Sequence, residues 1–192
     1  MIDTRCDYCI GTANARLQKS LTAMLAEAGF NSSGAANSVP ILLRKLRMVQ
    51  PWLAVIDTTL PPGNIEQLAA IIENDGLAAA IYVNTGGIRL DHYVQLNWPV
   101  EAPVLTAVAR ALCSEFAHKK RLHGEIEALQ RKLQERKLID KAKGILMSRY
   151  SLDEKEAFRF LQKNSMEQRV TMTETAGIII DDPARFSFLI RR

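Results

Sequence analysis

Short apolar runs alternate with amphipathic helical stripes through the first hundred residues, and this alternation most restricts what the chain can fold into. The apolar runs predict strands at 7–11, 53–57, 79–83 and 93–96, with a weaker one at 31–35. Helical stripes lie between them at 17–28, 39–48 and 65–73. Strands that alternate with helices form a parallel sheet covered on both faces. The sequence therefore predicts a doubly wound α/β domain with five parallel strands.

A long helix should follow this domain, because no proline occurs between Pro103 and Arg149. Four apolar residues step along it by four, three and four positions, as in a coiled-coil seam: Leu122, Ile126, Leu129 and Leu133. Charged residues surround the seam and leave no other apolar face. We therefore expect a short dimeric coiled coil; a helix packed on its own domain is the alternative. Two heptads are too few to hold a dimer firmly alone.

The segment from Glu135 to Ile180 should form a compact three-helix unit. Ser151 with Glu154, and Thr171 with Glu174, have the spacing of capping boxes before apolar runs. This pattern predicts a helix, a turn, a helix, a loop over 165–171 and a short helix. The expected apolar core is Ile139, Ala142, Ile145, Leu146, Phe158, Leu161, Ala176 and Ile179.

Charge is distributed unevenly along the chain. Residues 1–115 contain 8 Lys and Arg against 10 Asp and Glu, whereas residues 116–192 contain 17 against 11. A basic half joined to a slightly acidic half is typical of a nucleic-acid-binding module attached to a control domain. A solvated helical surface with a moderate excess of cations would look the same.

The three-helix segment resembles the ANTAR domain along its whole length. The residues that carry the resemblance are Ala142, Gly144, Ile145, Leu146, Met147, Glu156, Ala157, Leu161, Ser165 and Ala176. ANTAR proteins include regulators of amidase, nitrate-assimilation and ethanolamine-utilisation operons. The resemblance implies binding to hairpins in leader RNA that prevents transcription termination.

The first domain resembles a two-component receiver over roughly residues 5–115. The stretch from Pro51 to Gly63 is similar to the third strand and following loop of that family, which places Asp57 at the phosphoacceptor position. Thr85, after the fourth expected strand, matches the switch hydroxyl. A fold with these landmarks is a five-stranded receiver-like domain.

Three departures from the receiver pattern argue against phosphorylation. The two acids that would hold Mg²⁺ are replaced by Thr12 and Ala13, and the expected lysine before Pro99 is Trp98. Only ten residues, 84–93, separate the last two expected strands, so the fourth helix should be reduced to a turn or loop. We therefore predict a pseudo-receiver that responds to a sensor protein or a small ligand. Asp57 is then a relic carboxylate that caps a loop or meets Ser or Thr hydroxyls at the strand ends; a residual phosphosite is the alternative.

No constellation of catalytic or metal-binding residues stands out. Cys6 and Cys9 form a single CxxC pair, but residues three apart on a strand point to opposite faces, so both are expected in the core. The histidines show no base–nucleophile pattern. We expect no enzyme activity, no metal and no cofactor. The N-terminus lacks the apolar core of a signal peptide and no run is long enough for a membrane span, so a cytoplasmic protein is expected.

Cations and hydroxyls in the C-terminal half are the candidates for RNA contact, because RNA loops are bound through phosphates and base edges. The proposed set is Lys141, Lys143, Arg149, Lys163, Ser165, Arg169, Thr171 and Thr173. Tyr150 is the expected exposed aromatic residue. Each of these is also compatible with an ordinary solvated surface or, for Thr171, with a helix cap.

The predicted organisation is a receiver-like domain (1–115), a coiled-coil linker helix (116–135), an ANTAR RNA-binding domain (136–180) and a C-terminal tail (181–192). The predicted function is transcription antitermination by a homodimer that binds RNA hairpins in mRNA leaders. The alternative is a signalling adaptor whose helical tail binds a protein. Helix-turn-helix binding to DNA is a third possibility, disfavoured here because the expected loop is longer than the usual turn.

Overall fold

The computed structural model describes residues 6–62, 64–86 and 88–182. The chain forms two compact units, and the boundary between them lies between Arg121 and Leu122. Each unit has its own apolar core.

The first unit contains a five-stranded, all-parallel sheet with the order β2-β1-β3-β4-β5. The strands are β1 (Asp7–Gly11), β2 (Asn31–Ala36), β3 (Leu53–Asp57), β4 (Ala79–Asn84) and β5 (Gln95–Asn97). The central strand β3 is buried along its whole length, as expected for a strand covered on both faces. The predicted doubly wound fold class is confirmed; the predicted fifth strand starts two residues too early.

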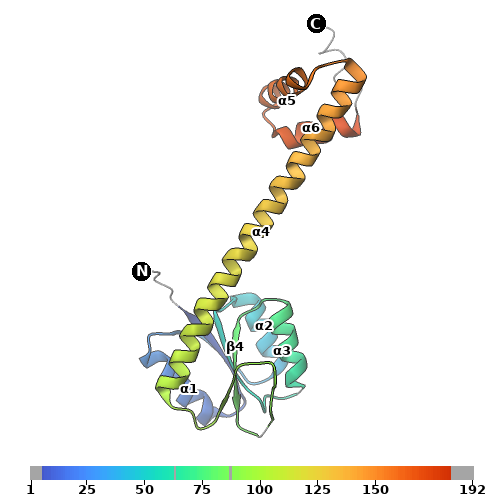
Figure 1. Ribbon diagram of the computed structural model, residues 1–192. Helices are drawn as coiled ribbons and strands as arrows, with labels where there is room; N and C mark the ends of the chain where they lie inside the picture. Colours follow the sequence, from blue (N-terminus) through green and yellow to red (C-terminus); the bar gives the residue numbers. More distant parts are fainter. Residues whose placement is uncertain (1–5, 63, 87, 183–192) are drawn as a thin grey trace. The chain divides into compact units, whose positions relative to one another are not determined.

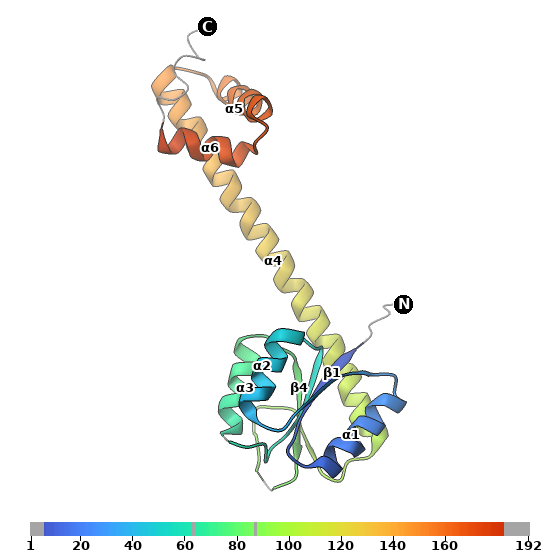
Figure 2. The ribbon, with the colours of Figure 1, turned by 180° about the vertical axis from the view of Figure 1, so that it is seen from behind.

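Helices cover both faces of this sheet (Figures 1 and 2). One face packs against α1 (Ala15–Glu27) and the start of α4 (Ala102–Tyr150). The other face packs against α2 (Val39–Val49) and α3 (Ile65–Asn74). Cys9 belongs to the second layer and Cys6 lies against the first, so the CxxC thiols lie on opposite faces of the sheet.

The connection between β4 and β5 contains no helix in its described residues 85, 86 and 88–94, which form turns and bends. Leu90 from this connection is buried, and its backbone N–H donates to Gln95 Oε1 at 2.9 Å. The prediction that a receiver's fourth helix is reduced to a loop is therefore correct for this region.

The second unit contains the rest of α4 together with α5 (Glu154–Gln168) and α6 (Met172–Asp181). Its buried core is made of small and branched residues from all three helices: Ala142, Leu146, Ala157, Leu161, Ala176 and Ile179. No described helix is both long and apolar enough to cross a membrane. The expected tail, 181–192, lies outside the described residues from 183 onward.

Two local predictions for this unit are wrong. The capping box of α5 is formed by Asp153 and Glu156, whereas Ser151 lies before the helix with a positive φ of 57°. The sequence SLDEKE contains two overlapping boxes, and the aspartate forms the one that the helix uses. The expected loop over 165–171 is also too long, because α5 continues to Gln168. The second predicted box, Thr171 with Glu174, caps α6 as expected.

Candidate functional site

Asp57 lies at the carboxyl end of β3 and is enclosed by threonine hydroxyls. Its Oδ2 accepts a hydrogen bond from Thr12 Oγ1 at 2.8 Å. Its Oδ1 accepts bonds from the Thr85 hydroxyl at 2.6 Å, the Thr59 hydroxyl at 2.8 Å and the Thr59 backbone N–H at 2.9 Å. These donors come from three loops that meet because carboxyl ends of parallel strands lie along one edge of the sheet.

The electrostatics of Asp57 follow from this enclosure. Only 2% of the residue is exposed. Burial alone would raise its pKa, but the hydrogen bonds from Thr85, Thr59 and Thr12 outweigh burial and hold the pKa of the carboxyl below its ordinary value. Asp57 is therefore ionised at neutral pH, and hydroxyl dipoles surround it where a receiver would place a metal ion and a lysine.

The Asp57 site brings together residues that sequence reasoning treated separately. Thr12, identified as the replacement for an acid, is a direct ligand of the carboxylate, and the predicted switch hydroxyl of Thr85 binds it too. Thr59 was missed, although an aspartate two residues before a threonine commonly accepts its backbone N–H in an Asx-turn. Within residues 6–62, 64–86 and 88–182, no three His, Cys, Asp or Glu side chains gather into a metal-binding group.

The candidate RNA-binding residues differ strongly in exposure. Lys141, Arg149 and Arg169 are exposed on the three-helix unit. Arg169 adopts a left-handed conformation (φ 55°) that ends α5 and leaves a three-residue connection, 169–171, to α6. Lys163 is also exposed, with its Nζ 3.8 Å from Glu167 on the next turn. These four cations are placed where a phosphate backbone could reach them.

The remaining candidates are engaged in the fold. Lys143 forms ion pairs with Asp140 at 2.8 Å and Glu154 at 2.9 Å, which raise its pKa and tie α4 to the start of α5. Ser165 is buried and donates to the Gln162 carbonyl, so its prediction as an RNA contact is not supported by its position. Thr171 caps α6, and Thr173 is half-buried in the first turn of that helix.

The aromatic predictions for this unit are reversed. Tyr150, expected to be exposed, is half-buried against the small core. Phe158, expected in the core, is 44% exposed, and Phe160 packs against the core in its place. A helix rotates by about 100° per residue, so Ala157 and Leu161 face inward while Phe158 faces outward.

The predicted dimerisation seam lies on the exposed part of α4. The exposed fractions of Leu122, Ile126, Leu129 and Leu133 are 42%, 51%, 65% and 53%. Four large apolar side chains on one stripe of a helix, all exposed in a single chain, are unusual for a surface that stays in water.

The class of protein follows from the two units together. A family model described as the ANTAR domain matches residues 127–180, which include the three-helix unit and begin inside the predicted linker. The first unit has the receiver fold: it superposes on the signal receiver domain of a Luxo repressor protein from Vibrio parahaemolyticus with a TM-score of 0.54, at 14% identity, over 62% of this chain and 97% of that one. The chain therefore combines an N-terminal domain of the receiver fold with a C-terminal segment that matches the ANTAR domain.

Similarity to one particular regulator extends over most of the chain, and similarity to a second covers about a third of it. The transcriptional regulatory protein PdtaR of Mycobacterium tuberculosis is 24% identical over 180 residues, covering 90% of this chain and 88% of that protein. A nitrate regulatory protein of Klebsiella oxytoca is 36% identical over 70 residues, which cover 36% of this chain and 18% of that protein. Both relatives are named as regulators.

Proposed function

We propose that this protein is a transcription antiterminator that binds hairpins in leader RNA through its ANTAR domain. The observation that carries the proposal is the ANTAR match over residues 127–180, on a folded three-helix unit with exposed cations. The proposed contact set consists of the exposed cations Lys141, Arg149, Lys163 and Arg169. Lys143, Thr171 and Thr173, which are engaged in the fold, are secondary members of this set. Phosphate neutralisation by such cations supplies affinity, and unpaired loop bases supply specificity.

RNA binding is tested with the full-length chain and a pool of fluorescent RNA hairpins with randomised loops. Selected hairpins should bind with an affinity that falls as salt rises, because each neutralised phosphate releases counterions. Arg169→Gln and Lys163→Gln should each reduce the slope of log affinity against log salt concentration by about one, the contribution of one phosphate contact. A selected pool without a shared loop sequence, or binding that ignores salt, would contradict the proposal and favour the protein-binding adaptor.

Duplex DNA is the competitor to include, because one observation favours it as a second candidate ligand. The connection between α5 and α6 has three residues, 169–171, which is the length of a helix-turn-helix turn. The longer loop that seemed to disfavour DNA does not exist. A DNA duplex with the stem sequence should compete weakly if the protein reads RNA loops, and as well as the hairpin if it reads a major groove.

The exposed apolar seam is the proposed dimer contact. Its spacing puts Ile126 and Leu133 at a positions and Leu122 and Leu129 at d positions. This pattern suits a coiled coil of two parallel helices. In this register Lys132 at a g position would face Lys137 at an e position of the second copy. Like charges across the seam weaken the coil, so this dimer should be weak and open to control.

Dimerisation gives the second hairpin of a tandem pair a high effective concentration, so affinity for two hairpins should exceed that for one. Leu129→Asp places a charge on the seam, whereas Ala128→Asp places the same charge on the neighbouring position off the seam. Sedimentation equilibrium should show a monomer only for Leu129→Asp. The same variant should bind single and tandem hairpins equally; unchanged preference for tandem hairpins would rule out control by dimerisation.

The receiver-like domain is proposed to work without phosphorylation. The hydroxyls of Thr12, Thr59 and Thr85 already occupy both oxygens of Asp57, and Thr12 and Ala13 provide no carboxylate for Mg²⁺. Incubation with a small phosphodonor and Mg²⁺ should leave Asp57 unmodified by mass spectrometry. Stoichiometric labelling of Asp57 would refute this part of the proposal.

A further inference from the structure

A hollow of about 290 Å³ lies between the last turns of α4 and the first turns of α5. It is lined by Lys143, Glu154, Lys155, Phe158 and Arg159. Its size is at the lower end of the range for small-ligand pockets, roughly 300–1,000 Å³. Four of its lining residues are charged and one is aromatic, so the hollow offers a flat apolar ring inside a polar rim.

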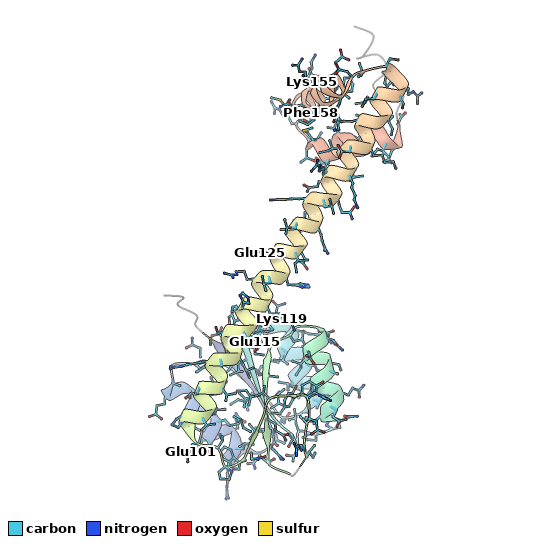
Figure 3. All side chains as sticks on the ribbon, viewed as in Figure 1. Glu101, Glu115, Lys119, Glu125, Lys155 and Phe158 are labelled. Atoms are coloured by element: carbon cyan, nitrogen blue, oxygen red, sulfur yellow. The ribbon has the colours of Figure 1, made fainter. Side chains whose placement is uncertain are left out.

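Phe158 is the unusual member of this group. It is 44% exposed, although the adjacent Ala157 and Leu161 on the same helix are completely buried. Figure 3 shows Phe158 and Lys155 on the same helix, α5. Other side chains of α5 form the small core, and Phe158 is not among the residues of that core.

The charges around the ring are of two kinds. Lys143 is paired with Asp140 and with Glu154 across the hollow's wall, and only 15% of its side chain is exposed. Lys155 and Arg159 lie one helical turn apart, both exposed, and neither has an ion-pair partner in the described part of the chain. Lys143 is therefore held by its carboxylate partners, whereas Lys155 and Arg159 leave cationic groups available beside the ring.

An exposed aromatic ring flanked by unpaired cations suits an unpaired nucleotide. Bases stack on aromatic side chains, and the phosphates on either side of a splayed base need cations nearby. We propose that this hollow receives one unpaired base of an RNA hairpin loop, stacked on Phe158, with its flanking phosphates bound by Lys155 and Arg159. The inference rests on the proposed RNA-binding function and names a contact that the ANTAR motif residues do not include.

The hollow favours a nucleotide over a protein anchor. A protein hot spot is a well-packed, largely apolar pocket, whereas the only apolar lining residue here is Phe158. Glu154, the single acid of the rim, is held by Lys143, so the groups free to meet a ligand are cationic. A polyanion carrying a flat ring satisfies both features.

The test uses the full-length chain and a hairpin from the selected pool, with 2-aminopurine at each loop position in turn. One loop position should lose fluorescence on binding the wild type, because stacking quenches the probe. Phe158→Ala should abolish that quenching and weaken binding about 5- to 150-fold, the range for loss of one stacked base. Phe158→Tyr should keep both. Lys155→Gln should lower the salt slope by about one charge and leave the quenching intact.

Met166→Ala is the matched control, because Met166 is also an exposed apolar residue of α5, at 72%, but does not line the hollow. It should bind as the wild type does, and circular dichroism should show the same helix content for all variants. Wild-type affinity and quenching in Phe158→Ala would overturn the stacking site alone. Failure of the wild type to bind any hairpin would overturn the proposed function together with this inference.

Discussion

Removal of the Asp57 carboxylate should destabilise the receiver-like domain, and the reason lies with its partner Thr12. In Asp57→Ala the Thr12 hydroxyl loses its acceptor, and Thr12 is only 2% exposed, so water has little access to replace it. Thr59 and Thr85 are exposed, and water can take over their hydrogen bonds. The neighbouring receiver positions hold Thr12 and Ala13, so removal relieves no repulsion between clustered acids.

The size of the effect follows from the buried donor. A buried polar group left without a partner costs about 1–3 kcal/mol, so Asp57→Ala should lose an amount in that range. Asp57→Asn should lose less, about 1 kcal/mol, because the amide keeps an acceptor oxygen for Thr59 and Thr85 and offers an N–H₂ group to the Thr12 oxygen.

Urea unfolding followed by tryptophan fluorescence measures this directly, because both tryptophans of the chain, Trp52 and Trp98, belong to the receiver-like domain. With a slope of roughly 2 kcal/mol per molar urea, a loss of about 2 kcal/mol moves the midpoint by about 1 M. The Asn variant should fall between the wild type and Asp57→Ala.

The pH dependence has a definite sign. The pKa of Asp57 is lower in the folded domain than in the unfolded chain, so its stabilising contribution is complete above the unfolded value of about 3.9. It should be lost as the pH falls through the folded pKa. The difference between wild type and Asp57→Asn should therefore be constant from pH 5 to 8 and shrink below about pH 4.

Two results would refute this reasoning. Equal or greater stability of Asp57→Ala at pH 7 would mean that the desolvation of the buried carboxylate costs at least as much free energy as its hydrogen bonds to the threonines contribute. A rise of the wild-type midpoint in about 10 mM Mg²⁺, absent in Asp57→Ala, would reveal a cation bound to the carboxylate, since a ligand specific for the native state stabilises it.

Three further predictions concern other parts of the molecule. Burial and the neighbouring Cys6 raise the pKa of Cys113 to about 12, so iodoacetamide at pH 8 should label Cys113 at least about a hundredfold more slowly in the native protein than in urea; rapid native labelling would contradict it. Ala157→Leu adds atoms where no space is exposed and should destabilise the three-helix unit by about 1–3 kcal/mol, seen as earlier thermal loss of helix signal; an unchanged transition would mean that the core accommodates the side chain. Thr171→Ala removes the cap of α6 and should cost about 1 kcal/mol in the same assay, whereas Thr173→Ala, outside the cap, should cost less.

Most strands were predictable because burial in a sheet requires a recognisable apolar pattern in the sequence. A strand covered on both faces must be apolar throughout, as β3 is, and β1 and β3 were predicted with their observed bounds. The edge strand β5 was predicted too early because residues 95 and 96 are half-buried, residue 97 is exposed, and the three carry little apolar signal. Its pairing with β4 depends on backbone hydrogen bonds that any side chain permits.

The end of α5 was not predictable from residue type. Asn164 and Ser165 look like loop residues, yet both are buried in the helix and bond back to the carbonyls of Phe160 and Gln162. Polar side chains of this kind satisfy themselves on the preceding turn, so they continue a helix when packing favours it. The helix ends at Arg169, whose left-handed conformation has no signature in a residue other than glycine or asparagine.

The Asp57 site was half predictable. The sequence identified the carboxylate, the missing acids and the switch hydroxyl, because each has a fixed position relative to a strand end. It did not reveal that Thr12 points at Asp57, since that contact joins residues 45 positions apart. At this position the presence of Thr12 matters more than the absence of an acid. The threonine supplies a hydrogen-bond donor to Asp57, where an acid would have required a metal ion between the two carboxylates.

Salt should affect the two proposed steps in opposite directions, and this links them. RNA binding weakens as salt rises, whereas the proposed seam, with Lys132 facing Lys137 across it, should tighten as the repulsion is screened. RNA is itself a polyanion, so a hairpin bound to one copy reduces the positive charge that opposes pairing. By linkage, whatever RNA contributes to dimerisation, dimerisation returns to RNA affinity. In the proposed dimer, preference for tandem over single hairpins should therefore persist at salt concentrations where neither RNA binding nor dimerisation alone is strong. The receiver-like domain then needs only to shift a monomer–dimer equilibrium that RNA already moves toward the dimer.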